Sequence, residues 1–223
     1  MFSNELNKVI GTYTTDVNGE IYIENLRTGN YRVIEKNTNK WYNLADDVNV
    51  EIKWNETNEI TIENELKKGQ IKVIKVDKDN KEIKLQGVKF NVLNENGDIL
   101  ETITTDKDGI AYTSRYVVRD FQKLILQETE TLKNYVLNDE PQTIELKENE
   151  ITNIVFDNKK ISGNVELTKT DVEHKEKISN CTFKIYKDSN MNGRLDEDDE
   201  HVDTLEETEK GIYEKQNLEL QKD

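Results

Sequence analysis

Cysteine, histidine and proline are scarce in this sequence of 223 residues. Its one cysteine, Cys181, excludes an intrachain disulfide, so an extracellular protein of this kind needs another means of stabilisation. Its two histidines, His174 and His201, lie far apart in charged segments and do not make a metal site by themselves. No Gly/Ser-rich or proline-rich spacer occurs, so successive domains are expected to abut.

Long apolar runs are lacking as well. No stretch approaches the roughly 18 apolar residues of a membrane span, and the first residues, MFSNELNK, lack the apolar segment of a signal peptide. We therefore expect no membrane insertion by this segment, and an exported protein would carry its signal and anchor outside it. The net charge of −15, with acidic and lysine residues interleaved, disfavours nucleic acid as a partner.

The balance of charged and apolar residues approaches that of a disordered chain. Charged residues make up 35% and hydrophobic residues 34%, and the mean hydropathy is −0.87. Against disorder, valine, isoleucine and aromatic residues recur in short alternating runs, which are typical of half-buried strands. Helical periodicity is nearly absent. We therefore predict a folded, all-β protein.

The sequence contains an internal repeat. The segment Gly69-Gln-Ile-Lys-Val-Ile-Lys75 recurs as Gly163-Asn-Val-Glu-Leu-Thr-Lys169, at an offset of 94 residues (169 − 75). This repeat divides the chain into three modules. Module one is partial and spans residues 1–67, module two is complete and spans residues 68–160, and module three is partial and spans residues 161–223.

In module two, three strand rows that should face the core end in a polar residue. Side chains alternate between the faces of a strand, so Lys75 shares the inward face of Ile71 and Val73. Glu128 and Asn158 end two further inward rows in the same way. The equivalent residues are Glu35 and Asn64 in module one and Lys169 in module three, and neither partial module can complete the set within this chain.

Two interpretations of these residues are open. In the first, burial neutralises the Lys75 amine, which attacks the side-chain carbonyl of Asn158 while protonated Glu128 shuttles the proton and ammonia leaves. The product is an amide crosslink formed once per molecule, so no enzyme with turnover is expected. In the second, the polar residues merely mark strand ends, and the lysine reaches water. Their co-occurrence at repeated spacings favours the crosslink.

Five features of module two carry a family resemblance: Gly69–Asp77, Leu85–Phe90, Thr105–Gly109, Glu128 with Tyr135, and Asn158. Together they resemble the collagen-adhesin B-type (CnaB, SpaA-pilin-like, prealbumin-like) domain of Gram-positive surface proteins. The resemblance implies tandem immunoglobulin-like (prealbumin-like) β-sandwich modules, of which the first and third are incomplete here. It also implies cell-wall attachment and a Lys–Asn isopeptide bond catalysed by an acidic residue, at the positions of Lys75, Asn158 and Glu128.

The chain departs from the family pattern after the glutamate. The family often has Ala-Pro-x-Gly-Tyr there, whereas this chain has Thr131-Leu-Lys-Asn-Tyr135 in module two and Thr38-Asn-Lys-Trp-Tyr42 in module one. The shape of this loop therefore does not follow from the resemblance.

An acidic loop at residues 188–199 of module three has the spacing of a calcium-binding loop. Glycine stands at loop position 6, and position 12 is aspartate instead of the usual glutamate. The oxygen-bearing residues at positions 1, 3, 5, 9 and 12 are Asp188, Asn190, Asn192, Asp196 and Asp199. The alternative is an acidic, solvated hairpin insertion. The crosslink itself requires no cofactor, so Ca²⁺ is the one cofactor that the sequence suggests.

These patterns predict an extracellular, cell-wall-attached stalk or spacer of an adhesin or pilin, whose partners are the adjacent modules of the same polypeptide. An alternative is that the modules themselves bind host extracellular matrix proteins or glycans. A third option is an accessory region beside a catalytic domain that lies outside this segment.

Overall fold

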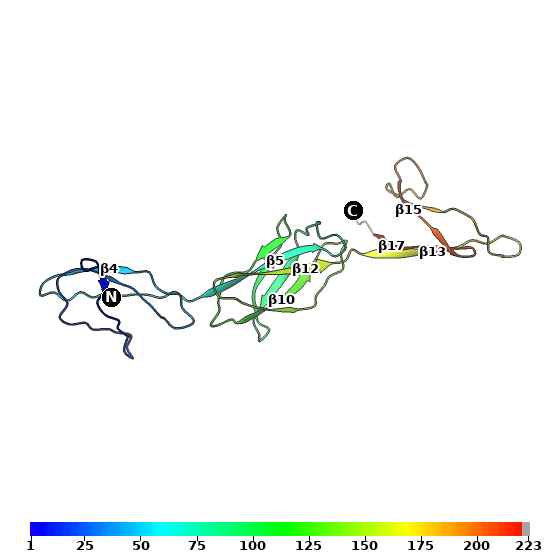
Figure 1. Cartoon of the computed structure of the whole chain (residues 1–223). Coiled ribbons are helices and arrows are strands. Elements are labelled where there is room, and N and C mark those ends of the chain that lie inside the picture. The colour runs from blue at the N-terminus through cyan, green and yellow to red at the C-terminus, as the bar shows by residue number, and fades with distance from the viewer. Residues whose placement is uncertain (220–223) are drawn as a thin grey trace.

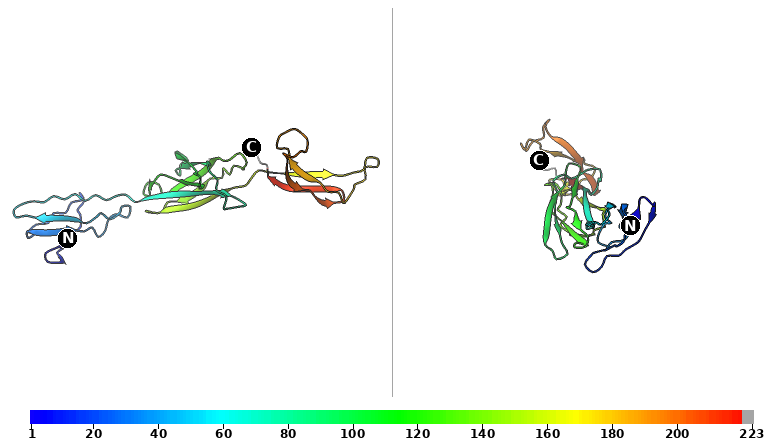
Figure 2. Two further views of the ribbon diagram at one scale, coloured as in Figure 1. Left: turned by 90° about the horizontal axis from the view of Figure 1, so that it is seen from above. Right: turned by 90° about the vertical axis from the view of Figure 1, so that its left-hand side faces the viewer.

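The computed structural model describes residues 1–219, which form three β-rich bodies in a row (Figure 1). The left view in Figure 2 shows the same extended arrangement, and the right view looks along its long axis. Among these residues no helix occurs, and therefore none that could cross a membrane. The predicted all-β fold class is confirmed.

Module one forms a single four-stranded antiparallel sheet with the order β2-β1-β3-β4. Its strands are β1 (Phe2–Ser3), β2 (Lys8–Val9), β3 (Gly29–Val33) and β4 (Val48–Ile52). Tyr31 on β3 is buried, and its hydroxyl donates a hydrogen bond to the backbone carbonyl of Arg27 over 2.8 Å.

Module two is a sandwich of two sheets. One sheet has the order β12-β5-β8, with β9 also paired to β5, and the other has the order β11-β10-β6-β7. The strands are β5 (Lys68–Asp77), β6 (Lys89–Leu93), β7 (Ile99–Thr104), β8 (Ile110–Tyr112), β9 (Tyr116–Val117), β10 (Lys123–Glu130), β11 (Gln142–Glu145) and β12 (Ile151–Asn158).

The hydrophobic core of module two lies between these sheets. Ile71 and Val73 of β5 and Leu124 and Leu126 of β10 have no exposed surface, as alternating strands with one buried face require. The aromatic rings of Phe90 and Phe156 meet across the core with their centroids 4.9 Å apart.

The first and last strands of module two are neighbours and run parallel. In the register of β5 and β12, Phe156 lies opposite Lys75 and Asn158 lies opposite Asp77. Because β5 receives the chain from module one and β12 passes it to module three, both connections run through this strand pair (Figure 1).

Module three contains a three-stranded sheet with the order β13-β17-β16 and a separate β14-β15 hairpin. The strands are β13 (Ser162–Thr168), β14 (Lys184–Lys187), β15 (Glu200–Thr204), β16 (Glu206–Glu209) and β17 (Ile212–Glu219). Tyr213 is buried, and its ring packs edge-on against Phe183 with a centroid distance of 4.9 Å.

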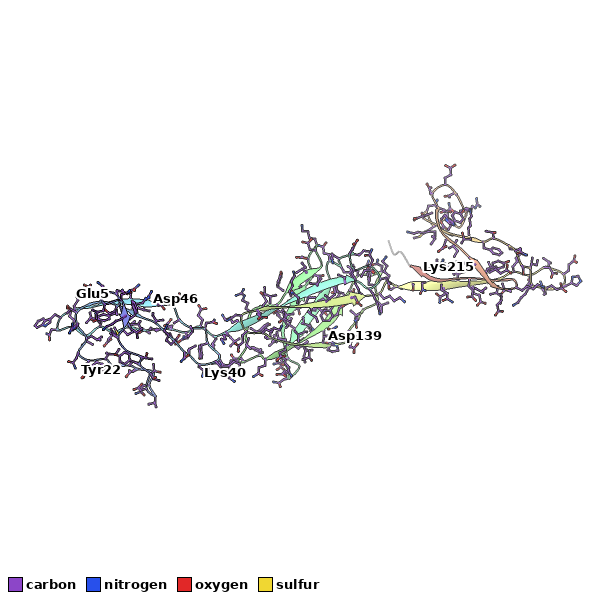
Figure 3. The ribbon with its side chains drawn as sticks, in the orientation of Figure 1. Glu5, Tyr22, Lys40, Asp46, Asp139 and Lys215 are labelled. Atoms are coloured by element: carbon purple, nitrogen blue, oxygen red, sulfur yellow. The ribbon has the colours of Figure 1, made fainter. Side chains whose placement is uncertain are left out.

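Modules one and two touch each other directly. Lys67 Nζ lies 2.7 Å from Glu148 Oε2, and Asn149 Nδ2 donates a hydrogen bond of 2.6 Å to Asn43 Oδ1. Trp41 of module one packs against the hydrophobic core of module two. Lys40, labelled in Figure 3, lies at the end of module one that faces module two. Modules one and two therefore abut, as expected for this pair.

Module one lacks a counterpart of the last strand of module two. The segment 57–64, which corresponds to β12 in the repeat, belongs to no strand, and Ile60 keeps 39% of its surface exposed. In module two, β12 is held by its hydrogen bonds to β5, whereas the described residues place no strand beside 57–64. An extended segment without a paired neighbour lacks the ladder that defines a strand.

Truncating a core residue of module two should destabilise it strongly. We expect Ile71→Ala to lower the free energy of unfolding of residues 68–160 by about 2–5 kcal/mol, because it removes fully buried methyl and methylene groups and leaves a cavity. Urea titration of the full chain, read by hydrogen–deuterium exchange on peptides from module two, measures the change.

Ile99→Ala is the matched control, since Ile99 on β7 keeps 60% of its surface exposed. This variant should change the free energy of unfolding by roughly 0.5 kcal/mol or less. Equal effects of the two substitutions would contradict the described core.

Candidate functional site

Lys75, Glu128 and Asn158 meet in the interior of module two. Lys75 lies on β5 and Asn158 on the neighbouring β12, while Glu128 lies on β10 of the opposite sheet. Each follows two apolar residues on the inward face of its strand, so strand alternation points all three side chains into the sandwich. Their exposed fractions are 0% for Lys75 and 1% for Glu128 and Asn158.

The three side chains contact one another in a closed triangle. Lys75 Nζ lies 2.8 Å from Glu128 Oε2, and it also donates a hydrogen bond to Asn158 Oδ1. Asn158 Nδ2 in turn donates a hydrogen bond of 2.5 Å to Glu128 Oε1. The amine therefore lies against the amide that it would attack, and the carboxyl group touches both nitrogens.

The surroundings of Lys75 favour its neutral form. Burial lowers the pKa of Lys75 because the apolar interior cannot solvate an ammonium, and the Glu128 carboxyl group only partly opposes this effect. The aromatic ring of Phe90 is one of the apolar groups around this amine, with its centroid 6.0 Å from Lys75 Nζ. A neutral amine held against an amide carbonyl is a positioned nucleophile, and a carboxyl group in contact with both nitrogens can carry a proton between them.

A glycine positions the backbone of the lysine strand. Gly109 has a φ of +68°, and a Cβ added there would come within 2.5 Å of the Lys75 carbonyl oxygen. The Lys75 N–H donates a hydrogen bond of 2.7 Å to the Gly109 carbonyl. Module three repeats this arrangement, because the Lys169 N–H donates to the Gly211 carbonyl over 2.8 Å. In the sequence, Gly109 was evident only as the last residue of the family feature Thr105–Gly109.

Sequence reasoning also missed two groups that hold the site. Thr131 Oγ1 accepts a second hydrogen bond from Asn158 Nδ2, over 2.7 Å. Asp77, one full strand repeat beyond Lys75, is buried, and its Oδ2 accepts a hydrogen bond of 2.8 Å from the Tyr135 hydroxyl. Two signals in the sequence could have indicated these groups. Asp77 has the same inward parity as Lys75, and a threonine stands three residues after each of the two glutamates.

The partial modules contain parts of the same arrangement. In module one, Asn64 Nδ2 donates hydrogen bonds to Glu35 Oε2 over 2.6 Å and to the Asn43 carbonyl over 2.8 Å. In module three, Lys169 Nζ donates a hydrogen bond of 3.0 Å to the neighbouring Thr170 carbonyl. The structure therefore brings Glu35 and Asn64 together but brings neither of them to Lys169.

The acidic loop connects β14 to β15 and is exposed. Asp188 accepts hydrogen bonds from the backbone N–H groups of Asn192 and Gly193, and Asp196 accepts hydrogen bonds from the side-chain amides of Asn190 and Asn192. Asp199 also faces into the loop, where its Oδ2 accepts the backbone N–H of Asp196 over 3.1 Å. No group of three His, Cys, Asp or Glu side chains in residues 1–219 is placed to hold a metal ion. Calcium binding by this loop stays a prediction.

The chain belongs to the SpaA family of prealbumin-like fold domains. The family model matches residues 2–66 and residues 69–160, which together form more than half of the chain. The predicted family resemblance is therefore confirmed. A search of curated protein sequences returned no match.

The chain is also similar to solved structures. The TIE protein of Bacillus anthracis is 30% identical, with a TM-score of 0.67 over 96% of this chain and 39% of that one, so this chain spans well under half of its length. GBS52, a minor pilin of Streptococcus agalactiae, is 19% identical with a TM-score of 0.38, covering 67% of each chain. A streptococcal ancillary pilin is 20% identical with a TM-score of 0.38, covering 87% of this chain and 64% of that one.

The buried carboxylate of Asp77 should make module two sensitive to acid. Burial raises the pKa of Asp77, but hydrogen bonds from the Asn80 backbone N–H and the Tyr135 hydroxyl lower it below its ordinary value. Because the pKa of Asp77 is lower in the folded state than in the unfolded state, its ionised carboxylate stabilises the module at pH values above the unfolded-state pKa. This stabilisation is lost as the pH falls through the folded-state pKa. We therefore expect Tyr135→Phe to raise the pKa of Asp77, to cost about 1–3 kcal/mol of unfolding free energy near neutral pH, and to move the acid transition to higher pH.

Urea midpoints of module two measured between about pH 2 and 6 would test this acid dependence. Asp77→Asn should flatten the dependence, whereas Asp79→Asn should leave it unchanged because Asp79 is exposed. A wild-type pH profile in the Asp77→Asn variant would contradict the assignment.

Proposed function

We propose that this chain is part of a load-bearing stalk of an extracellular, cell-wall-attached protein, braced in module two by an isopeptide bond between Lys75 and Asn158. The observation that supports the bond is the closed, buried triangle of Lys75, Glu128 and Asn158. Membership of the SpaA family and the end-to-end arrangement of the modules support the stalk (Figure 1).

The proposed reaction conserves every atom of the two side chains except those of one ammonia. Neutral Lys75 Nζ attacks Asn158 Cγ and forms the new C–N bond. Glu128 exchanges protons with the two nitrogens: it gives one to Asn158 Nδ2 and takes one from Nζ, after which the Cγ–Nδ2 bond breaks and ammonia leaves. Glu128 is suited to this exchange because its two oxygens contact the two nitrogens separately. The reaction consumes its own side chains and occurs once.

The bond would stabilise the module by shortening the free chain of the unfolded state. Lys75 and Asn158 are 83 residues apart, and a crosslink that closes a loop of this size contributes roughly 4–5 kcal/mol by analogy with disulfides. This stabilisation takes the place of the disulfides that the sequence excludes.

The position of the bond also determines how the module bears tension. Force from module one enters the module at Lys68, where β5 begins. It leaves toward module three at Asn158, where β12 ends. A covalent link between Lys75 and Asn158 would pass this force from one strand to the other. The residues between them would carry no load, so the sandwich would stay folded under tension.

The intact mass of the purified chain tests the bond. We expect the wild type to be lighter than its sequence mass by one ammonia, and fragmentation should yield a peptide in which Lys75 is joined to Asn158. Lys75→Ala should show its full sequence mass because it lacks the nucleophile.

Glu128→Gln is the matched variant for the proton transfer, since it keeps the shape of the side chain but cannot exchange a proton in the same way. It should also retain its full mass. A wild-type protein at full sequence mass after complete folding would rule out the crosslink.

Single-molecule stretching tests the load path. Without the bond, unfolding of module two should release the 83-residue segment and add about 280 Å of extended chain, whereas the wild type should not release it. Glu128→Gln should behave like Lys75→Ala. Equal extension of wild type and Glu128→Gln would contradict the proposed path of force.

A further inference from the structure

The Asn158 side-chain nitrogen, which leaves as ammonia in the proposed reaction, is held by two acceptors. Asn158 Nδ2 donates to Glu128 Oε1 over 2.5 Å and to Thr131 Oγ1 over 2.7 Å. A primary amide carries two N–H groups, so both are used. The amide oxygen is then left to face Lys75 Nζ, which donates to it.

This pair of acceptors fixes the orientation of the amide. Rotating the Asn158 amide by half a turn would place its oxygen against Glu128 and Thr131 and its N–H groups against Lys75. In that orientation the nitrogen would lie away from Glu128 and could not receive the proton that it needs to leave. The Glu128 carboxyl group opposes this rotation because its Oε1 accepts from the amide nitrogen, and the hydrogen bond from the second N–H to the Thr131 hydroxyl adds to what holds the nitrogen on that side.

Thr131 also lies on the solvent side of the site. It follows the end of β10 and is half-buried, whereas Lys75, Glu128 and Asn158 are at most 1% exposed. The nitrogen that departs therefore faces the one partner of the amide that borders water.

Module one offers an internal comparison. Thr38 stands three residues after Glu35, as Thr131 does after Glu128. There the second acceptor for the Asn64 amide is the Asn43 backbone carbonyl, at 2.8 Å. Both modules thus give the asparagine nitrogen a second acceptor beside the glutamate, but only module two uses the threonine hydroxyl for it.

We propose that Thr131 is a positioning residue for the crosslinking reaction, which holds the Asn158 nitrogen on the side of Glu128 and of solvent. Its hydroxyl stands where the family pattern often has alanine, so the contact is a feature of this chain beyond the Lys–Asn–Glu set. The proposal rests on the proposed function, because a positioning role requires that the crosslink forms.

The rate of ammonia loss in Thr131→Val and Thr131→Ser tests this role. Valine keeps the shape of threonine but cannot accept the hydrogen bond, whereas serine keeps the hydroxyl. We measure intact mass against time after cell-free synthesis of the full chain. Thr131→Val should form the bond about tenfold more slowly than wild type, and Thr131→Ser should form it at close to the wild-type rate.

Two further measurements separate the possible failures. The unfolding midpoint of Lys75→Ala and of Lys75→Ala/Thr131→Val, both without the bond, reports whether the substitution disturbs folding. If the substitution disturbs folding, Thr131→Ala is used in its place, because it also lacks the hydroxyl that accepts from Asn158 Nδ2, and it should also form the bond slowly. A wild type that loses no ammonia overturns the crosslink itself, whereas a fast Thr131→Val overturns only the role of Thr131.

Discussion

Module two depends on the mutual contacts of an amine, a carboxyl group and an amide that are almost completely hidden from water. Each of these groups would be costly to bury alone, and the contacts among Lys75, Glu128 and Asn158 offset that cost. The same burial lowers the pKa of Lys75 and so favours the neutral amine that the proposed reaction needs. Burial of these polar groups is therefore costly for the stability of the core, and the same burial favours the proposed reaction.

The sheet topology determines how the proposed bond would carry force. Parallel pairing of β5 and β12 brings the strand that enters the module beside the strand that leaves it. Because Lys75 lies near the end of β5 and Asn158 at the end of β12, a bond between them would join the two connections of the module directly. The same site in loops away from these strands would stabilise the sandwich without carrying tension through it.

The repeat shows which parts of the arrangement act together. The lysine strand and its glycine contact recur in module three, and the glutamate–asparagine pair recurs in module one. Where the lysine strand has no counterpart in the described residues, the segment 57–64 does not form a strand. The lysine strand therefore supplies both the nucleophile and the hydrogen-bonding edge on which the last strand is ordered.

Alternation in the sequence by itself determined the all-β fold and the inward direction of Lys75, Glu128 and Asn158, because strand parity is a local property. The family followed from the resemblance of motifs in module two. The sequence could not establish that Glu128 comes from the opposite sheet, that Thr131 holds the Asn158 nitrogen, or that Tyr135 binds Asp77. Those contacts join residues that are distant along the chain, or lie in a loop that departs from the family pattern. Only the packing of the two sheets decided them, since distances across a sandwich depend on how its faces meet.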